Sequence, residues 1–361
     1  MDDCVTNIEE VESIQTSLSN VIDFCDEAMA VIDNRRRNGE VIVNAATIQV
    51  ALKTPMTVRR PSVKFQLKSA LGLDTLLRSS RAERKQPFIN GIEYLSDSRI
   101  GVIDNENNEC WIIDKNSKVT TAPYAFATTP RDITCISNDT FCTFAVTVSN
   151  GNINTICILK CNPGNRIICL QKTIVLYDCC DAVCMIRHLY LVSTLNAEQA
   201  VFAVDENGTK TTLRGLQMTK KIQNFGDCKC VYDRNIDTMF ITDKTDNSVC
   251  VHNKLEMTKN ILKDANIKSP IGICLGPAGS GSVFVCCSET NNIAYVGSDG
   301  QLSDLIDIDL ETPEVISFDN VRQKLSVVSN KQRSIVTYDV LFIERHSRKR
   351  SSRRSDRVKT V

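Results

Sequence analysis

Cysteine has the widest chemical repertoire of the residues in this chain, because thiolates bind zinc, form disulfides and act as nucleophiles. The 361 residues hold 17 cysteines but only three histidines. Three pairs have the close spacing that metal ligands show: Cys157 and Cys161, Cys180 and Cys184, and Cys228 and Cys230. A structural zinc site is therefore one interpretation of the cysteine pattern.

A structural role for the cysteines is the other interpretation. Many of them lie inside apolar runs typical of strands, where neighbouring side chains point to opposite faces and do not converge on one ion. The odd total, in a chain whose start does not resemble a signal peptide, argues against a disulfide framework. We therefore expect reduced cysteines that pack as small hydrophobic residues, with no metal and no cofactor.

A repeat supplies the elements that must position these residues. Six times between residues 85 and 344, two apolar strand-like runs flank a short polar turn, and the turns recur about every 45 residues. Further apolar runs lie on either side of each unit, such as Lys118-Val-Thr-Thr121 after the first one, which makes four strands per repeat. The six turns fall at 105–108, 149–152, 195–199, 243–247, 289–292 and 330–333.

A strand repeat of this length predicts propeller blades, because one small sheet cannot bury both faces until its neighbours stack on it. We predict an all-β, six-bladed propeller over residues 85–344. A β-sandwich or jelly roll is the alternative, which six units of near-constant length fit poorly. Little chain follows the sixth unit, so we expect a strand from 63–67 or 71–77 to complete the last blade and remove its open edge.

The turns between the second and third strands emerge on one face of such a propeller, together with the connections between blades. Loops of this kind commonly carry the function of a propeller. Their mixed charges favour recognition of a partner through complementary pairs. The candidate partner-binding residues are Glu106, Lys220, Lys221, Lys244, Asp246, Glu289, Lys331 and Arg333.

The N-terminal residues 1–54 have a helical pattern. Apolar residues spaced by three and four indicate a short coiled-coil seam, which predicts weak homodimerisation. Packing of this helix on the propeller is the alternative. The seam residues are Val11, Ile14, Leu18, Val21 and Cys25. Residues 55–84 follow as a linker and closing strand.

The C-terminal residues 345–361 form a basic segment with eight Lys or Arg and one acid, which leaves the rest of the chain with a net charge of −7. We expect this tail to be disordered, and either to direct nuclear entry, to bind anions, or to be a solvated end. No apolar run approaches the length of a membrane span. The sequence therefore predicts a cytoplasmic protein without a membrane partner.

The chain resembles the C-terminal part of a TRIM-NHL (tripartite-motif) protein. The resemblance rests on the helix at 8–32, on Val63-Lys-Phe65, and on the NHL-like motifs of the fifth unit, Pro270-Ile-Gly-Ile273 and Ser288-Glu-Thr-Asn-Asn292. It implies the end of a coiled coil followed by a substrate-recognition propeller. The RING and B-box zinc modules of the family have no counterpart here, since only Cys4 and Cys25 precede residue 100. Ubiquitin-ligase activity is therefore not expected.

Three functions fit a propeller of this kind. The first is a non-catalytic adaptor that binds a protein or peptide on one face. The second is RNA binding, which several family members show, although it needs a basic stripe with stacking aromatics and only 6% of the residues are aromatic. The third is a lactonase or lyase, which the scarcity of histidine and the absence of a known catalytic motif disfavour.

Overall fold

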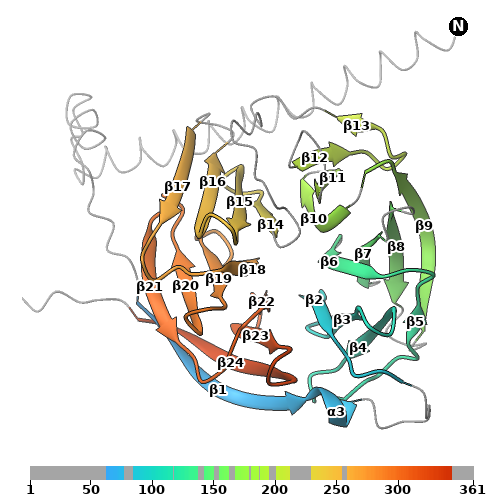
Figure 1. The fold of residues 1–361 in the computed structure, drawn as a ribbon, viewed down its shortest axis with the longest axis horizontal. Helices are drawn as coiled ribbons and strands as arrows, with labels where there is room; N and C mark the ends of the chain where they lie inside the picture. Colours follow the sequence, from blue (N-terminus) through green and yellow to red (C-terminus); the bar gives the residue numbers. More distant parts are fainter. Residues whose placement is uncertain are drawn as a thin grey trace, which may run out of the picture. The chain divides into compact units, whose positions relative to one another are not determined.

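The computed structural model describes residues 62–76, 84–116, 118–136, 142–149, 154–161, 167–178, 180–186, 188–194, 201–211, 229–253 and 258–343. These residues form six four-stranded antiparallel sheets arranged in a ring (Figure 1). The predicted six-bladed propeller is confirmed. The predicted coiled-coil segment with Val11, Ile14, Leu18, Val21 and Cys25, and the basic tail, lie outside the described residues.

Each blade runs from an innermost strand to an outermost strand, and five blades follow chain order. Blade one comprises β2 (Ile89–Tyr94), β3 (Ile100–Asp104), β4 (Glu109–Ile113) and β5 (Tyr124–Ala125). Blade two comprises β6 (Pro130–Cys135), β7 (Cys142–Ser149), β8 (Asn154–Cys161) and β9 (Ile168–Leu176). Blade three comprises β10 (Cys180–Ile186), β11 (Leu189–Thr194), β12 (Val201–Val204) and β13 (Lys210–Thr211).

The second half of the ring has the same organisation. Blade four comprises β14 (Cys230–Asp233), β15 (Thr238–Asp243), β16 (Ser248–Asn253) and β17 (Thr258–Lys263). Blade five comprises β18 (Pro270–Leu275), β19 (Val283–Cys287), β20 (Asn292–Val296) and β21 (Leu302–Asp307). Blade six contains β22 (Val315–Asp319), β23 (Lys324–Ser329) and β24 (Ser334–Ile343).

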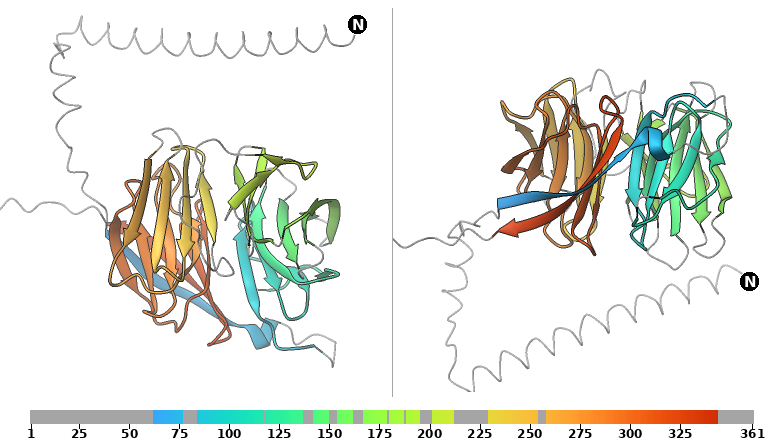
Figure 2. Two further views of the ribbon diagram at one scale, coloured as in Figure 1. Left: turned by 45° about the horizontal axis from the view of Figure 1, so that its top comes forward. Right: turned by 90° about the horizontal axis from the view of Figure 1, so that it is seen from below.

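The sixth blade is closed by a strand from the other end of the propeller. Strand β1 (Ser62–Gly72) pairs antiparallel with β24, from Ser62 opposite Ile343 to Gly72 opposite Ser334. Figure 2 shows the two strands side by side on the outside of the ring. The segment 63–67 thus takes the expected outer position, while the second candidate, 71–77, begins at the end of β1 and continues into the short helix α3 (Leu73–Leu76).

The core lies between neighbouring sheets. One cluster joins blades five and six, where the ring of Phe284 lies 5.4 Å from that of Phe318 and 5.9 Å from that of Phe65 on the closing strand. Large side chains such as Trp111 and Phe144 are completely buried. Because each cluster draws on two blades, a single sheet would expose one apolar face, and stacking around the ring stabilises all six.

The outer strand of blade one differs from the expected one. The sequence predicted a strand at 118–121, whereas β5 is Tyr124–Ala125 and Val119 makes only an isolated bridge with Ile113. The reason is a competition for the edge of β4. The Thr121 hydroxyl accepts a hydrogen bond from the Ile112 N–H, and the Thr120 hydroxyl donates one to the Ile112 carbonyl. Side chains therefore replace part of the ladder there.

The structure also bears on membrane association. Among the described residues, no helix is long and apolar enough to cross a membrane.

Candidate functional site

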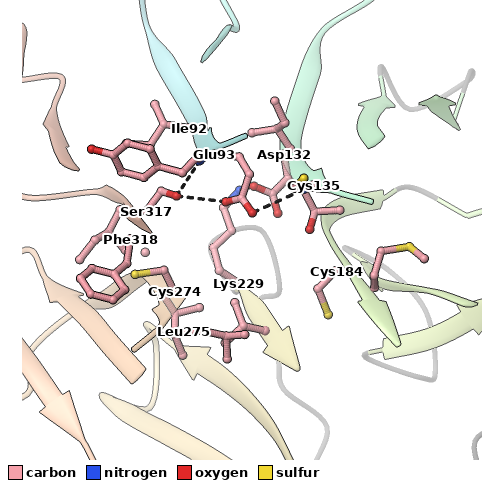
Figure 3. Close-up of a pocket in the computed structure, with 18 of the residues that line it drawn as sticks. Ile92, Glu93, Asp132, Cys135, Cys184, Lys229, Cys274, Leu275, Ser317 and Phe318 are labelled. Carbon is pink, nitrogen blue, oxygen red and sulfur yellow. Dashed lines mark hydrogen bonds and ion pairs between the residues drawn. The ribbon is translucent and has the colours of Figure 1, made fainter. Parts of the chain in front are cut away.

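A central cavity of about 540 Å³ is lined by residues from the innermost strands of all six blades. Figure 3 shows part of its lining. In β2, β6, β10 and β18 the first residues of the strand are not among the lining residues, whereas the later ones are. The cavity therefore lies toward the turns between first and second strands. We name that side of the propeller the cavity face, and the opposite side, which carries the connections between blades, the connector face.

A buried ion pair lies at the inner part of this cavity. The Lys229 Nζ lies 2.6 Å from the Asp132 Oδ1, and the two side chains are only 16% and 12% exposed. The same ammonium group donates to the backbone carbonyls of Asn90 and Arg131, at 3.4 and 3.3 Å. Lys229 thus reaches from blade four to blades one and two (Figure 3). All three of its donors are used, so its role is to join blades across the channel.

Asp132 extends this network to blade three, because its Oδ2 accepts a hydrogen bond of 3.0 Å from the Val183 N–H. The bond is possible because β10 has a register shift between Cys180 and Val183, which releases backbone groups from the ladder with β11. A carboxylate and an ammonium that are both satisfied in this way stabilise the channel wall.

Glu93 is a carboxylic acid of the cavity that is held by hydrogen bonds and not by an ion pair. Its Oε2 accepts a hydrogen bond of 3.2 Å from the Ser317 hydroxyl, and its Oε1 accepts a long one of 3.5 Å from the Cys135 N–H. The pKa of Glu93 is raised to about 7, mainly by burial; the two hydrogen bonds act against this rise, and the nearby Asp132 charge adds to it. The side chain is half-buried because it faces the cavity. At neutral pH it can both accept and donate a proton.

Several thiols also line the cavity. The Sγ atoms of Cys184 and Cys230 lie 3.6 Å apart, and Cys274 and Cys135 lie elsewhere on the wall. All thirteen described cysteines are free thiols and eleven are buried, as expected for cysteines that pack as small hydrophobic residues. In the described ranges, no group of three Cys, His, Asp or Glu side chains is placed to hold a metal ion.

Exposed residues mark the rim of the cavity on the cavity face. Val321 is 84% exposed although it is apolar, and Arg234 and Asn320 are exposed beside the same cavity. Val321 and Asn320 belong to the turn between β22 and β23, whose position is fixed by Asp319. The Asp319 Oδ1 accepts hydrogen bonds from the Val321 and Arg322 N–H groups. The rim therefore offers an apolar and a cationic contact beside a recess.

The candidate residues predicted from the sequence lie on the connector face. Of the eight, Glu106, Lys244, Asp246, Glu289, Lys331 and Arg333 are described, and each is in a turn between second and third strands. Lys220 and Lys221 lie outside the described residues. The six residues come from four blades, so the structure distributes them around the ring and does not gather them in one site. Their role in partner binding stays a prediction.

Four of these six residues form ion pairs within the chain. Their partners come from the connections between blades and from adjacent elements. The pairs are Glu106 with Lys85 at 3.4 Å, Asp246 with Lys263 at 2.7 Å, Lys331 with Glu311 at 2.7 Å, and Arg333 with Asp74. A partner that uses these charges must therefore displace an internal pair.

Asparagines of the same turns hold the connections between blades in place. The Asn330 amide binds the N–H and the carbonyl of Ile89 at 2.8 and 2.9 Å, and Asn291 Oδ1 accepts from the Thr312 N–H at 2.8 Å. Asn291 has a positive φ of 56°, a conformation that asparagine tolerates better than most residues. The polar composition of these turns thus has a structural cause.

The sequence analysis did not find the cavity residues Glu93, Asp132 and Lys229. They are far apart in the sequence, and no short motif contains more than one of them. A signal does exist: a charged residue inside the first strand of a blade, where one face points toward the channel. Glu93 in Gly91-Ile-Glu-Tyr-Leu95 and Asp132 in Arg131-Asp-Ile-Thr-Cys135 both fit it.

Comparison with known proteins shows the fold but no family. Neither protein-family models nor curated proteins match the sequence. Among solved structures, a protein of unknown function from Bacteroides thetaiotaomicron is similar with a TM-score of 0.58 at 10% identity, covering 78% of this chain and 76% of that one. A luciferin-regenerating enzyme has a TM-score of 0.53 at 10% identity, covering 78% and 95%. A streptogramin B lyase has a TM-score of 0.50 at 11% identity, and the match covers 78% of this chain and 98% of the lyase.

Proposed function

We propose that this protein is a non-catalytic adaptor that recognises a protein or peptide partner on one face of its propeller. The observation that carries the proposal is the central cavity, a preformed recess with exposed Val321 and Arg234 at its rim. Side chains that enter such recesses dominate the binding energy of many protein interfaces. The resemblance to the recognition propeller of TRIM-NHL proteins favours the same role, in a ubiquitin-ligase-like context.

The cavity face is a better candidate for the partner-binding surface than the connector face. Its inner charges, Lys229 and Asp132, are paired with each other and with backbone groups, so the recess keeps its shape without a ligand. A preformed recess lowers the entropic cost of binding. On the connector face, by contrast, a partner has to replace ion pairs such as Lys331 with Glu311.

A pair of double variants tests which face binds. The full chain would be immobilised and used to capture partners from lysate, with captured proteins identified and then repurified for direct titration. Val321→Glu with Arg234→Glu is expected to weaken binding of a repurified partner at least tenfold. Lys331→Glu with Arg333→Glu, the matched control on the connector face, should change it less than twofold. The opposite result would assign the interface to the connector face.

The same experiment tests RNA binding. Ribonuclease treatment of the lysate should leave the captured partners in place if they bind as proteins. If the partners are lost, and if the affinity for a single-stranded RNA falls steeply with salt concentration, RNA becomes the ligand. Circular dichroism and thermal melting of each variant would show that the propeller remains folded.

An enzyme is the second candidate, and Glu93 is the observation that favours it. A carboxylic acid with a pKa of about 7 in a central cavity has the properties of a general acid or base. Its reaction class would be proton abstraction or hydrolysis, as in a lyase or lactonase. A panel of lactones and cyclic esters tests this. Turnover that is lost in Glu93→Gln but kept in Lys331→Gln would establish catalysis and overturn the adaptor proposal.

A further inference from the structure

Two cysteines from neighbouring blades meet at the wall of the central cavity. Cys184 lies in β10 of blade three and Cys230 in β14 of blade four. Their Sγ atoms are 3.6 Å apart, with the Cys230 thiol donating a hydrogen bond to the Cys184 sulfur. Both residues line the cavity and are nearly completely buried in the protein around it. A disulfide needs a sulfur separation of about 2 Å, so the two sulfurs have to move closer by about 1.6 Å.

A bond between these two sulfurs would join two sheets of the propeller. Strands β10 and β14 belong to separate sheets, so no backbone ladder joins them. Both strands contribute apolar side chains to one core cluster, such as Ile186 of β10 and Tyr232 of β14. A covalent bond between Cys184 and Cys230 would connect two blades directly at the channel, next to the Asp132–Lys229 ion pair.

We propose that Cys184 and Cys230 are a redox modification site, at which a peroxide that enters the central cavity converts the two thiols to a disulfide between blades three and four. In the first step one thiolate attacks a peroxide oxygen, the O–O bond breaks, and a sulfenic acid forms with release of water after proton transfer. The second thiol then attacks the sulfenic sulfur and releases another water. Two thiols are oxidised, and one hydrogen peroxide is reduced to two waters.

The surroundings of the pair make this oxidation slow at neutral pH. The interaction with the neighbouring Cys230 thiol raises the pKa of the Cys184 thiol well above its usual value, and burial and the charge of Asp132 act in the same direction. Because the thiolate is the reactive form, the pair stays reduced until peroxide accumulates. Access through the cavity then decides which buried thiols react, since buried cysteines such as Cys286 are not among the residues that line it.

Mass spectrometry of the full chain tests the proposal. Reduced protein would be treated with hydrogen peroxide, quenched, alkylated under denaturing conditions and digested with trypsin without reduction. Cleavage after Lys229 and Arg234 gives a peptide with Cys230 as its only cysteine. We expect this peptide to be joined to residues 173–187, with a mass two hydrogens below the sum of the two peptides.

Three variants identify the bond, because the second peptide also contains Cys179 and Cys180. Cys184→Ser and Cys230→Ser should both lose the crosslink, whereas Cys274→Ser, which changes another thiol of the same cavity, should keep it. Alanine variants of the same positions serve if a serine variant does not fold. Oxidation should also raise the thermal unfolding midpoint of the wild type by about 5 °C. It should not raise the midpoint of Cys184→Ser or Cys230→Ser.

Other outcomes overturn the proposal. A crosslink that persists in Cys184→Ala would assign the bond to a different cysteine. Sulfinic acid on Cys230 without a crosslink, or an unmodified Cys230 after the exposed Cys169 has been oxidised, would show that the two sulfurs do not form a reactive pair. None of these results depends on the capture of a partner. The redox proposal and the adaptor proposal are therefore tested independently.

Discussion

The two faces of the propeller use ion pairs in different ways. At the cavity, Lys229 and Asp132 are 16% and 12% exposed. Through their ion pair and three hydrogen bonds to backbone groups, they connect four blades. On the connector face, Lys331 and Glu311 are 65% and 53% exposed at a similar distance. The comparison shows that the same residue types stabilise the ring in one place and lie at its surface in the other. Burial, which the residue type does not reveal, makes the difference.

The largest effect is expected at the cavity. Lys229→Met removes the cation and leaves the Asp132 carboxylate buried without its partner, which should lower the free energy of unfolding by about 3–5 kcal/mol. Denaturant unfolding of the variant measures this loss. Asp132→Asn added to Lys229→Met should recover part of it, because the second change removes the unpaired charge. A loss below about 1 kcal/mol would mean that the pair behaves like those of the connector face.

The next largest effect should come from a neutral residue on the connector face. Asn330→Ala removes the amide that binds both backbone groups of Ile89, a completely buried residue. Unpaired backbone groups at that position should cost about 2–3 kcal/mol of unfolding free energy. Asn320→Ala is the control. The Asn320 amide lies in a turn of the opposite face and accepts a hydrogen bond from the N–H of the exposed Ala278, so its loss should lower the free energy of unfolding less. Equal losses would contradict the structural role given to Asn330.

Glu93 should give the propeller a distinct pH dependence. Its pKa of about 7 lies above the ordinary value of 4.5, so between these values the folded state holds a proton that the unfolded state has lost. Its contribution to stability therefore falls as pH rises through that window. Glu93→Gln does not titrate, and its stability relative to wild type should rise by about 2 kcal/mol from about pH 4.5 to 8, since cavity water weakens the full effect. A pH-independent difference would place Glu93 in a solvated environment.

The smallest effect is expected for the exposed pair. Lys331→Gln should change the unfolding free energy by less than about 1 kcal/mol, because exposed ion pairs gain little over solvation of the separate charges. The remaining change should shrink further in high salt. If this substitution costs as much as Lys229→Met, exposure is not what separates the two faces.

The architecture could be predicted because it repeats. Each unit carries its own turn residues and apolar runs, so a local pattern such as Ser282–Cys287 followed by Ile293–Val296 identifies a blade without reference to the rest of the chain. The position of β1 followed from the missing fourth strand of the last unit. The short β5 could not be predicted, because the Thr120 and Thr121 hydroxyls compete with the backbone for the edge of β4.

The cavity could not be predicted for the opposite reason. Its chemistry depends on single residues from different blades, and nothing in the sequence around Lys229 indicates that its side chain reaches the carbonyls of Asn90 and Arg131. The charged turns were visible because they recur. Their internal ion pairs, such as Arg333 with Asp74, depend on connections and on α3, whose positions only the folded ring defines.

The pairing of β1 with β24 also sets an order of events during synthesis. Strand β1 is translated about 260 residues before the last strand that can pair with it. At a translation rate of about 5–20 residues per second, the edge of β1 remains unpaired for roughly 10–50 s. During that time Val63 and Phe65, which later pack into the core of blades five and six, have no partner of their own chain. A ribosome-associated chaperone that holds extended apolar segments would protect this strand until the propeller can close.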